Sequence, residues 1–216
     1  MQIISPNKVI RGKHAWEKAL PEILKYCKSP LLLGRSSKTR ALRSSIHKDL
    51  RNLNLNVYSA ELEFDCCEED LTRIYNLAID HNCDSIITAG GGKVLDAGKL
   101  LAEYISAPCI TVPLSAATCA GWTALANIYT TKGKFVKDIK LKSCPKILVC
   151  DHSFINSAPK QTLSSGIADS LAKWYESSIT SSSNKDGIIQ QAIQISRVLR
   201  DQLFIQGEDA FKNASE

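Results

Sequence analysis

A run of three glycines followed by a lysine is the segment of this sequence best suited to hold a ligand. Gly90–Gly92 follow an apolar run that ends at Ala89, and a helical pattern begins directly after them. Glycines let a backbone approach a ligand closely because no Cβ intervenes. A helix N-terminus offers free N–H groups and a positive dipole end to an anion. Lys93 and Asp96 add charges to the first turn of that helix. The spacing is neither GxGxxG nor that of a P-loop. A strand-to-helix turn without a ligand is the alternative, but the context favours a pyrophosphate site.

A second group of interest is a carboxylate inside an apolar helical pattern. Asp169 lies in the segment Ser164–Ile179, close to Ile167 and Leu171. A carboxylate among apolar neighbours needs a partner. Lys173, one helical turn further on, would provide an ordinary ion pair on the same helix face.

The elements that must position these groups alternate along the first two thirds of the chain. Short apolar runs, which predict strands, are separated by longer segments with helical spacing. The expected strands are Leu31–Leu33, Asn56–Ala60, Ser85–Ala89, Pro108–Pro113 and Lys146–Cys150. The expected helices are His14–Tyr26, Ser37–Leu53, Glu68–His81 and Gly92–Ile105. This alternation predicts an α/β fold with a parallel sheet covered on both sides.

Two segments depart from the alternation. The strands Leu125–Thr131 and Lys134–Ile139 flank Lys132 and Gly133, which predicts a β-hairpin. After Pro159 the strand signal stops, and Asp186–Phe204 follows as a second helix, with Asn184 as its expected N-cap. We therefore expect an α/β domain over residues 1–157 and the start of a helical domain over 158–216.

Composition and charge exclude several classes of function. The net charge is +5, and the basic residues are scattered without interleaved aromatics, which argues against nucleic-acid binding. The eight cysteines form no CxxC pair and no zinc-finger cluster, so reduced thiols in a cytoplasmic protein are expected. No apolar run is long enough for a signal peptide core or a membrane span.

The glycine turn resembles the cofactor-binding turn of the iron-containing, metal-dependent alcohol dehydrogenases, in the glycerol dehydrogenase branch. The shared pattern is Gly-Gly-Gly-Lys-x-Leu-Asp-x-x-Lys. Further stretches resemble the same family in the same order. They are Lys8–Gly12, Thr118–Leu125 with Ile128–Thr130, Ala158-Pro159 and Gly166–Glu176.

The resemblance implies a Rossmann-like nucleotide-binding domain followed by the first helices of an all-α metal-binding domain, the architecture of dehydroquinate synthase. It implies hydride transfer between NAD or NADP and the CH–OH group of a small alcohol, polyol or hydroxy acid. The implied cofactor residues are Gly91, Gly92, Lys93, Val94, Asp96, Leu114, Thr118, Thr123, Leu125 and Tyr129. Asp169 is implied as the first ligand of a catalytic zinc or iron ion, a Lewis acid that binds the substrate oxygen.

The sequence departs from the family pattern in three features, of which the first is the set of metal ligands. The family completes its metal site with two histidines from later helices, whereas His14, His47, His81 and His152 all precede Asp169. We therefore expect an incomplete metal site, as in a fragment of a longer enzyme or a truncated gene product.

Cys119 stands where glycerol dehydrogenases carry an Asp that helps to hold the polyol. Because a thiol is a weak hydrogen-bonder, this catalytic position favours a sister branch that acts on hydroxycarboxylates. Arg35 follows the first expected strand, where the family often has an acid near the adenosine ribose. An arginine there suits the 2′-phosphate of NADP, and a solvated surface charge is the alternative.

Two other functions stay open at this point. A lyase or cyclase of the dehydroquinate synthase type also uses NAD and a metal on this fold. A nucleotide-binding remnant without catalysis is the other alternative. The expected partners are a small-molecule substrate and, as an open alternative, a second copy of the chain, but neither nucleic acid nor a membrane.

Overall fold

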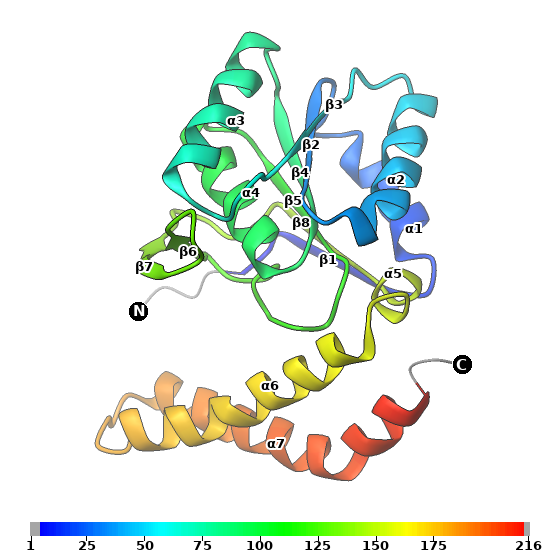
Figure 1. Cartoon of the computed structure of the whole chain (residues 1–216). Helices are drawn as coiled ribbons and strands as arrows, with labels where there is room; N and C mark the ends of the chain where they lie inside the picture. Colours follow the sequence, from blue (N-terminus) through cyan, green and yellow to red (C-terminus); the bar gives the residue numbers. More distant parts are fainter. Residues whose placement is uncertain (1–4, 214–216) are drawn as a thin grey trace. The chain divides into compact units, whose positions relative to one another are not determined.

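The computed structural model describes residues 5–213. The chain forms two compact units (Figure 1). The first comprises residues up to 114 together with 119–155, and the second comprises 115–118 together with the residues from 156 onward.

The first unit is built on a six-stranded sheet with the strand order β1-β8-β5-β4-β2-β3. Each pairing in this sheet is parallel. The strands are β1 Lys8–Gly12, β2 Pro30–Gly34, β3 Tyr58–Glu61, β4 Ser85–Gly90, β5 Cys109–Pro113 and β8 Ile147–Asp151. The parallel sheet expected from the sequence is thereby confirmed, although β3 begins two residues later than expected.

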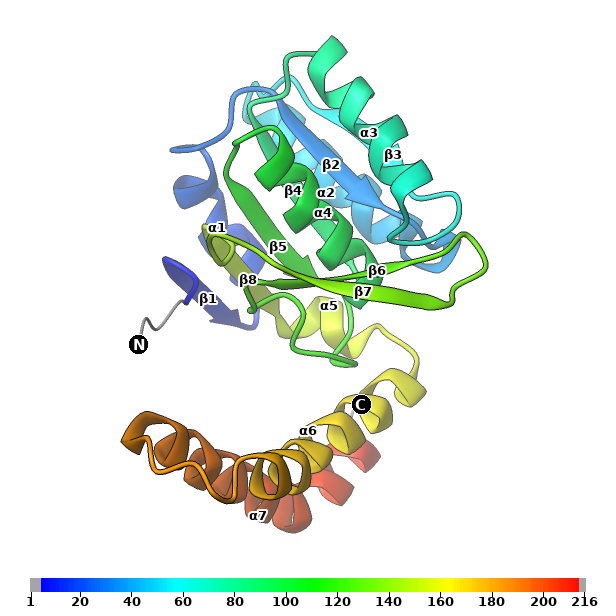
Figure 2. The ribbon, with the colours of Figure 1, turned by 90° about the vertical axis from the view of Figure 1, so that its left-hand side faces the viewer.

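Helices cover both faces of the sheet (Figure 2). They are α1 Ala15–Ile23, α2 Arg40–Asn52, α3 Glu68–Asp80, α4 Gly92–Tyr104 and the short α5 His152–Asn156. Successive strand residues point to opposite faces. In β4, Ile86 packs with α3 and α4, whereas its neighbour Ile87 packs with α1 and α2. This explains why the central strands are continuous apolar runs.

The predicted hairpin is confirmed. β6 Leu125–Tyr129 pairs antiparallel with β7 Phe135–Lys140. Gly133 in the connecting turn has φ +78°, a left-handed conformation that glycine adopts at little cost. Ala126 and Ile128 of β6 are buried with the α3 and α4 side of the core, so the hairpin is fixed to the helix that follows the glycine turn.

The second unit contains two long helices, α6 Lys160–Thr180 and α7 Gly187–Asn213. Arg200 of α7 lies 4.0 Å over the ring of Trp174 of α6. A Cβ on Gly166 would lie 1.8 Å from the carbonyl oxygen of Ala116, so the 115–118 segment contacts α6 closely. Among residues 5–213, no helix is long and apolar enough to cross a membrane.

The expected N-cap of the last helix is wrong by two residues. The Oδ1 atom of Asn184 accepts a hydrogen bond from the backbone N–H of Asp186, at 2.8 Å. Asp186 then accepts from the N–H of Ile188, also at 2.8 Å. Asn184 therefore shapes the preceding turn, and Asp186 supplies the helix cap.

Candidate cofactor-binding site

The glycine turn and the loop after β2 share one hollow at the carboxyl edge of the sheet. β2 and β4 are parallel neighbours, with Leu33 opposite Thr88, so the loops that follow them leave the same edge. The hollow has a volume of about 250 Å³. Its lining residues are Arg35, Ser36 and Thr39 from the first loop and Gly90, Gly91, Gly92, Lys93 and Val94 from the second. In open α/β sheets, ligands bind at this edge of the strands.

The glycine turn leaves the start of α4 uncapped by any side chain. Gly91 is the N-cap residue, and its carbonyl oxygen accepts from the N–H groups of Val94 and Leu95, both at 3.0 Å. The first N–H groups of a helix have no partner within it, so those of Gly92 and Lys93 are suited to bind an anion. A Cβ on Gly90 would lie 2.8 Å from Cβ of Val94, which explains the need for glycine before the helix.

Close packing fixes α4 against the sheet. The hydroxyl of Thr88 in β4 donates to the carbonyl oxygen of Val94 at 2.7 Å. A Cβ on Gly98 would lie 2.4 Å from the side chain of Thr88, so only a glycine permits this approach. Leu114, a predicted cofactor residue, is buried after β5, and its N–H donates to the carbonyl oxygen of Gly90 at 3.0 Å. The glycine turn is therefore held in place by its neighbours on both sides.

The ammonium group of Lys93 lies between two partners. It forms a hydrogen-bonded ion pair with the buried carboxylate of Asp65. It also lies 4.7 Å above the centre of the Tyr129 ring, a cation–π contact. The N–H of Tyr129 donates to the carbonyl oxygen of Cys66 at 2.8 Å, which ties the hairpin to the segment carrying Asp65. The structure thus brings Lys93 and Tyr129 together, with the charge of Lys93 balanced by Asp65.

Lys99 anchors the loop before the hairpin to α4. Its ammonium group is buried and donates to the carbonyl oxygens of Ala120 at 2.7 Å, Thr123 at 3.1 Å and Leu125. Asp96 lies beside it, with 2.9 Å between Oδ1 and Nζ, an ion pair without hydrogen-bond geometry at Oδ1. Burial raises the pKa of Asp96, and the charge of Lys99 opposes this rise.

The second oxygen of Asp96 holds the hairpin. It accepts from the backbone N–H of Asn127 in β6 at 3.1 Å. The family resemblance implies that Asp96 is a cofactor residue. In the structure it is 5% exposed and joins α4 to β6 and to Lys99. Its polar contacts therefore support the loop that contains Thr123 and Leu125.

The remaining predicted residues are distributed over both units. Cys119 has an exposed, free thiol in the loop before the hairpin. The hydroxyl of Thr111 donates to the carbonyl oxygen of Gly121 at 2.7 Å, which ties this loop to β5. Thr118 belongs to the 115–118 segment of the second unit.

Asp169 lies on α6 and pairs with Lys173, one turn further along, at 3.2 Å. Both side chains are more than a third exposed. Within residues 5–213, no group of three or more His, Cys, Asp or Glu side chains could hold a metal ion. A catalytic metal site has about three protein ligands. The residues that the structure describes therefore do not fit a complete metal site, and the ion pair expected as the alternative partner of Asp169 is present.

A family model described as iron-containing alcohol dehydrogenase matches residues 6–152. The chain therefore belongs to the iron-containing alcohol dehydrogenase family. This confirms the resemblance drawn from the glycine turn.

Relatives of known sequence agree with the family. The chain is 38% identical over 207 residues to an uncharacterized oxidoreductase from Synechocystis, covering 96% of this chain and 53% of that protein. It is 30% identical over 220 residues to a glycerol dehydrogenase from Escherichia coli, covering 99% and 60%. Hydroxycarboxylate dehydrogenase A from Escherichia coli is 37% identical over 113 residues, 51% of this chain and 30% of that protein.

Solved structures show the same fold. The glycerol dehydrogenase from Schizosaccharomyces pombe matches with a TM-score of 0.87 at 25% identity, over 99% of this chain and 55% of that chain. A probable glycerol dehydrogenase from Sinorhizobium meliloti matches with a TM-score of 0.85 at 26% identity, over 99% and 60%. The chain spans between half and two thirds of the length of these two enzymes.

Several residues of this region were not expected from the sequence. Asp65, Arg43 and Glu61 are joined to the site only by contacts between distant segments. Lys99 stands in the glycine motif, but its spacing gives no sign of the carbonyl groups that it binds. The position of Thr39 could have indicated that it lines the hollow, because it follows a strand at the same sheet edge as the glycine turn.

Proposed function

We propose that this chain binds a nicotinamide dinucleotide, with the pyrophosphate at the glycine turn. The observation that supports the proposal most directly is the hollow of about 250 Å³ between the start of α4 and the loop after β2. The uncapped N–H groups of Gly92 and Lys93 and the helix dipole favour an anion there. Gly91, Gly92, Lys93 and Val94 are the proposed pyrophosphate residues.

The loop after β2 favours NADP over NAD. Arg35 and Ser36 line the hollow where an acid would read the ribose hydroxyl of NAD, and a cation there suits the 2′-phosphate of NADP. An acid does stand nearby, since Glu61 of β3 is paired in register with Gly34. Its carboxylate is paired with Arg43 and Arg40, and these two cations balance its charge.

The activity that we propose is hydride transfer between this cofactor and the CH–OH group of a small alcohol, polyol or hydroxy acid. Asp96, Leu114, Thr118, Thr123, Leu125 and Tyr129 are the proposed residues toward the nicotinamide. Cys119 is the proposed substrate-side residue, and its thiol favours a hydroxycarboxylate over glycerol. The likeness to hydroxycarboxylate dehydrogenase A supports this branch. Asp169 is proposed as one ligand of the zinc or iron that the family uses.

The names of the relatives favour oxidoreduction over the lyase alternative, because they are dehydrogenases, a reductase and an oxidoreductase. The test is a calorimetric titration of the folded chain with NAD, NADH, NADP and NADPH. We expect saturable binding, tighter for the phosphorylated pair. A folded chain that binds none of the four would contradict the proposal.

A further inference from the structure

The guanidinium group of Arg43 lies directly against Gly34, the last residue of β2. A Cβ on Gly34 would lie 2.0 Å from Nε and 2.6 Å from Cζ of Arg43. Backbone strain does not explain the glycine, because the left-handed glycines of the described chain are Gly12 and Gly133. Gly34 therefore provides the space into which Arg43 folds, and any larger residue would displace the guanidinium.

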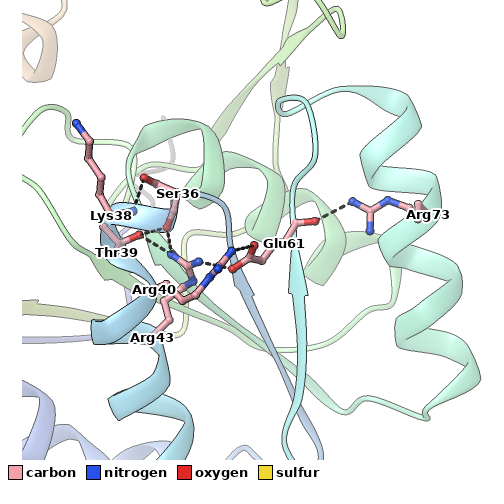
Figure 3. A network of polar contacts seen from close by, with 7 residues as sticks. All are labelled: Ser36, Lys38, Thr39, Arg40, Arg43, Glu61 and Arg73. Carbon is pink, nitrogen blue, oxygen red and sulfur yellow. Dashed lines mark hydrogen bonds and ion pairs between the residues drawn. The ribbon is translucent and has the colours of Figure 1, made fainter.

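From this seat Arg43 binds both ends of the turn that follows β2 (Figure 3). Its NH1 group donates to the carbonyl oxygen of Ser36 at 2.9 Å and to the hydroxyl of Thr39. Ser36 itself accepts from the N–H of Lys38 at 3.2 Å, which closes the short 3₁₀ turn η1, Ser37–Thr39. Ser36 and Thr39 line the proposed cofactor hollow, whereas Arg43 does not. Arg43 thus contacts two residues that line the hollow without lining the hollow itself.

The second terminal nitrogen of Arg43, NH2, binds the carboxylate of Glu61. NH2 of Arg43 donates to Oε1 of Glu61, and Arg40 pairs with Oε2 at 3.4 Å (Figure 3). The bond from Arg43 is the main cause that holds the pKa of Glu61 below its usual value. The side chain of Arg43 is 7% exposed, so this pair is shielded from solvent on its cationic side. The negative charge of Glu61 is thereby balanced by the two arginines, so it does not repel a phosphate at the same sheet edge.

We propose that Arg43, seated on Gly34, is a positioning residue that makes the hollow selective for the 2′-phosphate of NADP. Its hydrogen bonds to Ser36 and Thr39 fix the turn between these residues, and with it the direction of Arg35 at the start of the loop. A phosphate needs donors held in place, because ordering a mobile loop on binding costs free energy. NAD lacks that phosphate, so it gains little from the fixed turn. The inference rests on the proposed choice of NADP.

Gly34→Ala is the sharpest test, because it keeps every charge and only displaces the guanidinium. We expect Gly34→Ala and Arg43→Ala each to weaken NADP binding about 10-fold, the size of one lost charge-assisted hydrogen bond. The affinity for NAD should change by less than about 2-fold, since the pyrophosphate site is untouched. In the Arg43→Ala background, Gly34→Ala should have no further effect, because the new methyl group then fills empty space.

One further measurement and one control variant complete the experiment. Amide hydrogen exchange of residues 35–39 should be faster in both variants, a readout that does not depend on any cofactor. Arg51→Ala is the matched control, because it removes the same charge from the same helix roughly 12 Å further along, and it should change neither affinity. If Arg43→Ala does not fold, Arg43→Lys replaces it, since lysine keeps the charge without the two-pronged geometry.

Equal losses for both cofactors, additive effects in the double variant, or unchanged exchange of the turn would each overturn the positioning role. Unchanged affinities in variants of a parent that prefers NADP would overturn this inference alone. A parent chain that prefers NAD would contradict the proposed cofactor choice and, with it, the inference.

Discussion

Lys99 and Asp96 form a buried ion pair one turn apart on α4, with 2.9 Å between Nζ and Oδ1. The same lysine binds three backbone carbonyl groups of the loop before the hairpin. The helix that begins at the glycine turn therefore also fixes the loop that contains Thr123. One rigid element connects the two regions that we assign to the two ends of the cofactor.

Replacing Lys99 by methionine should be strongly destabilising. It leaves the carboxylate of Asp96 buried without its cation and three carbonyl groups without their donor. Breaking a buried pair in this way costs about 3–5 kcal/mol of unfolding free energy. Urea unfolding at pH 7, followed by circular dichroism, measures the loss. A change below about 1 kcal/mol, typical of an exposed pair, would show that Lys99 does not anchor the loop.

The same variant should become more stable as the pH falls. Burial raises the pKa of Asp96, and removing Lys99 removes the charge that opposes the rise. Between its ordinary pKa and this raised one, the folded chain binds more protons at Asp96 than the unfolded chain, so stability decreases with rising pH. The double variant Asp96→Asn with Lys99→Met is the control and should lose this dependence. A slope that persists in the double variant would place the titration elsewhere.

Because Lys93 is paired with Asp65, replacing Lys93 should lower the stability of the fold as well as the affinity for the cofactor. Lys93→Met leaves the buried Asp65 carboxylate without its cation. We expect a loss of about 1–2 kcal/mol, less than for a fully buried pair because Lys93 is 40% exposed. Adding Asp65→Asn should recover most of this stability without recovering cofactor affinity. Thermal unfolding and calorimetry of Lys93→Met, Asp65→Asn and the double variant measure both effects, and additive losses of stability would argue against the pair.

The sequence predicted the parts of this structure that depend on local pattern. The apolar runs around Ile86 and Ile110 predicted the central strands, because buried parallel strands are apolar on both faces. The glycine turn was recognisable because strand, glycines and helix are adjacent in the sequence. The ion-pair partners of Arg43 and Lys93 were not predictable, since Glu61 and Asp65 are distant in the sequence and only the tertiary fold brings them close. Residue type alone predicts Asn184 as the helix cap, whereas the side chain of Asp186 caps the helix in the structure.

Arg35 is expected to contribute to the choice of cofactor. Arg35→Asp places an acid where the 2′-phosphate of NADP would lie, and its carboxylate could accept a hydrogen bond from the ribose 2′-hydroxyl of NAD. We expect weaker NADP binding and equal or tighter NAD binding, measured by calorimetry on the folded variant. Lys38→Asp is a control with the same charge change in the same turn, outside the residues that line the hollow. The assignment of Arg35 fails if both substitutions act alike.

The chain of 216 residues is expected to bind zinc or iron weakly. The side chain of Asp169 is 39% exposed and paired with Lys173, and among the described residues no group of three or more His, Cys, Asp or Glu side chains could hold a metal ion. Elemental analysis after dialysis should find far less than one metal ion per chain, with little difference between the parent and Asp169→Asn. One tightly bound metal ion per chain, lost in Asp169→Asn, would show that a complete site exists.

The central claim is that the glycine turn binds the pyrophosphate of a nicotinamide dinucleotide. Gly92 is the first residue of α4 and does not have a left-handed backbone, so its backbone conformation is one that a valine can adopt. Gly187→Val is the matched control, because Gly187 is the first residue of α7. Calorimetric titration of NADP into the parent and both variants is the direct measurement. The account predicts binding to the parent and to Gly187→Val, and a loss of at least about 10-fold in a folded Gly92→Val, on the scale of one or more lost hydrogen bonds to a charged group. Unchanged affinity in a folded Gly92→Val chain would contradict it.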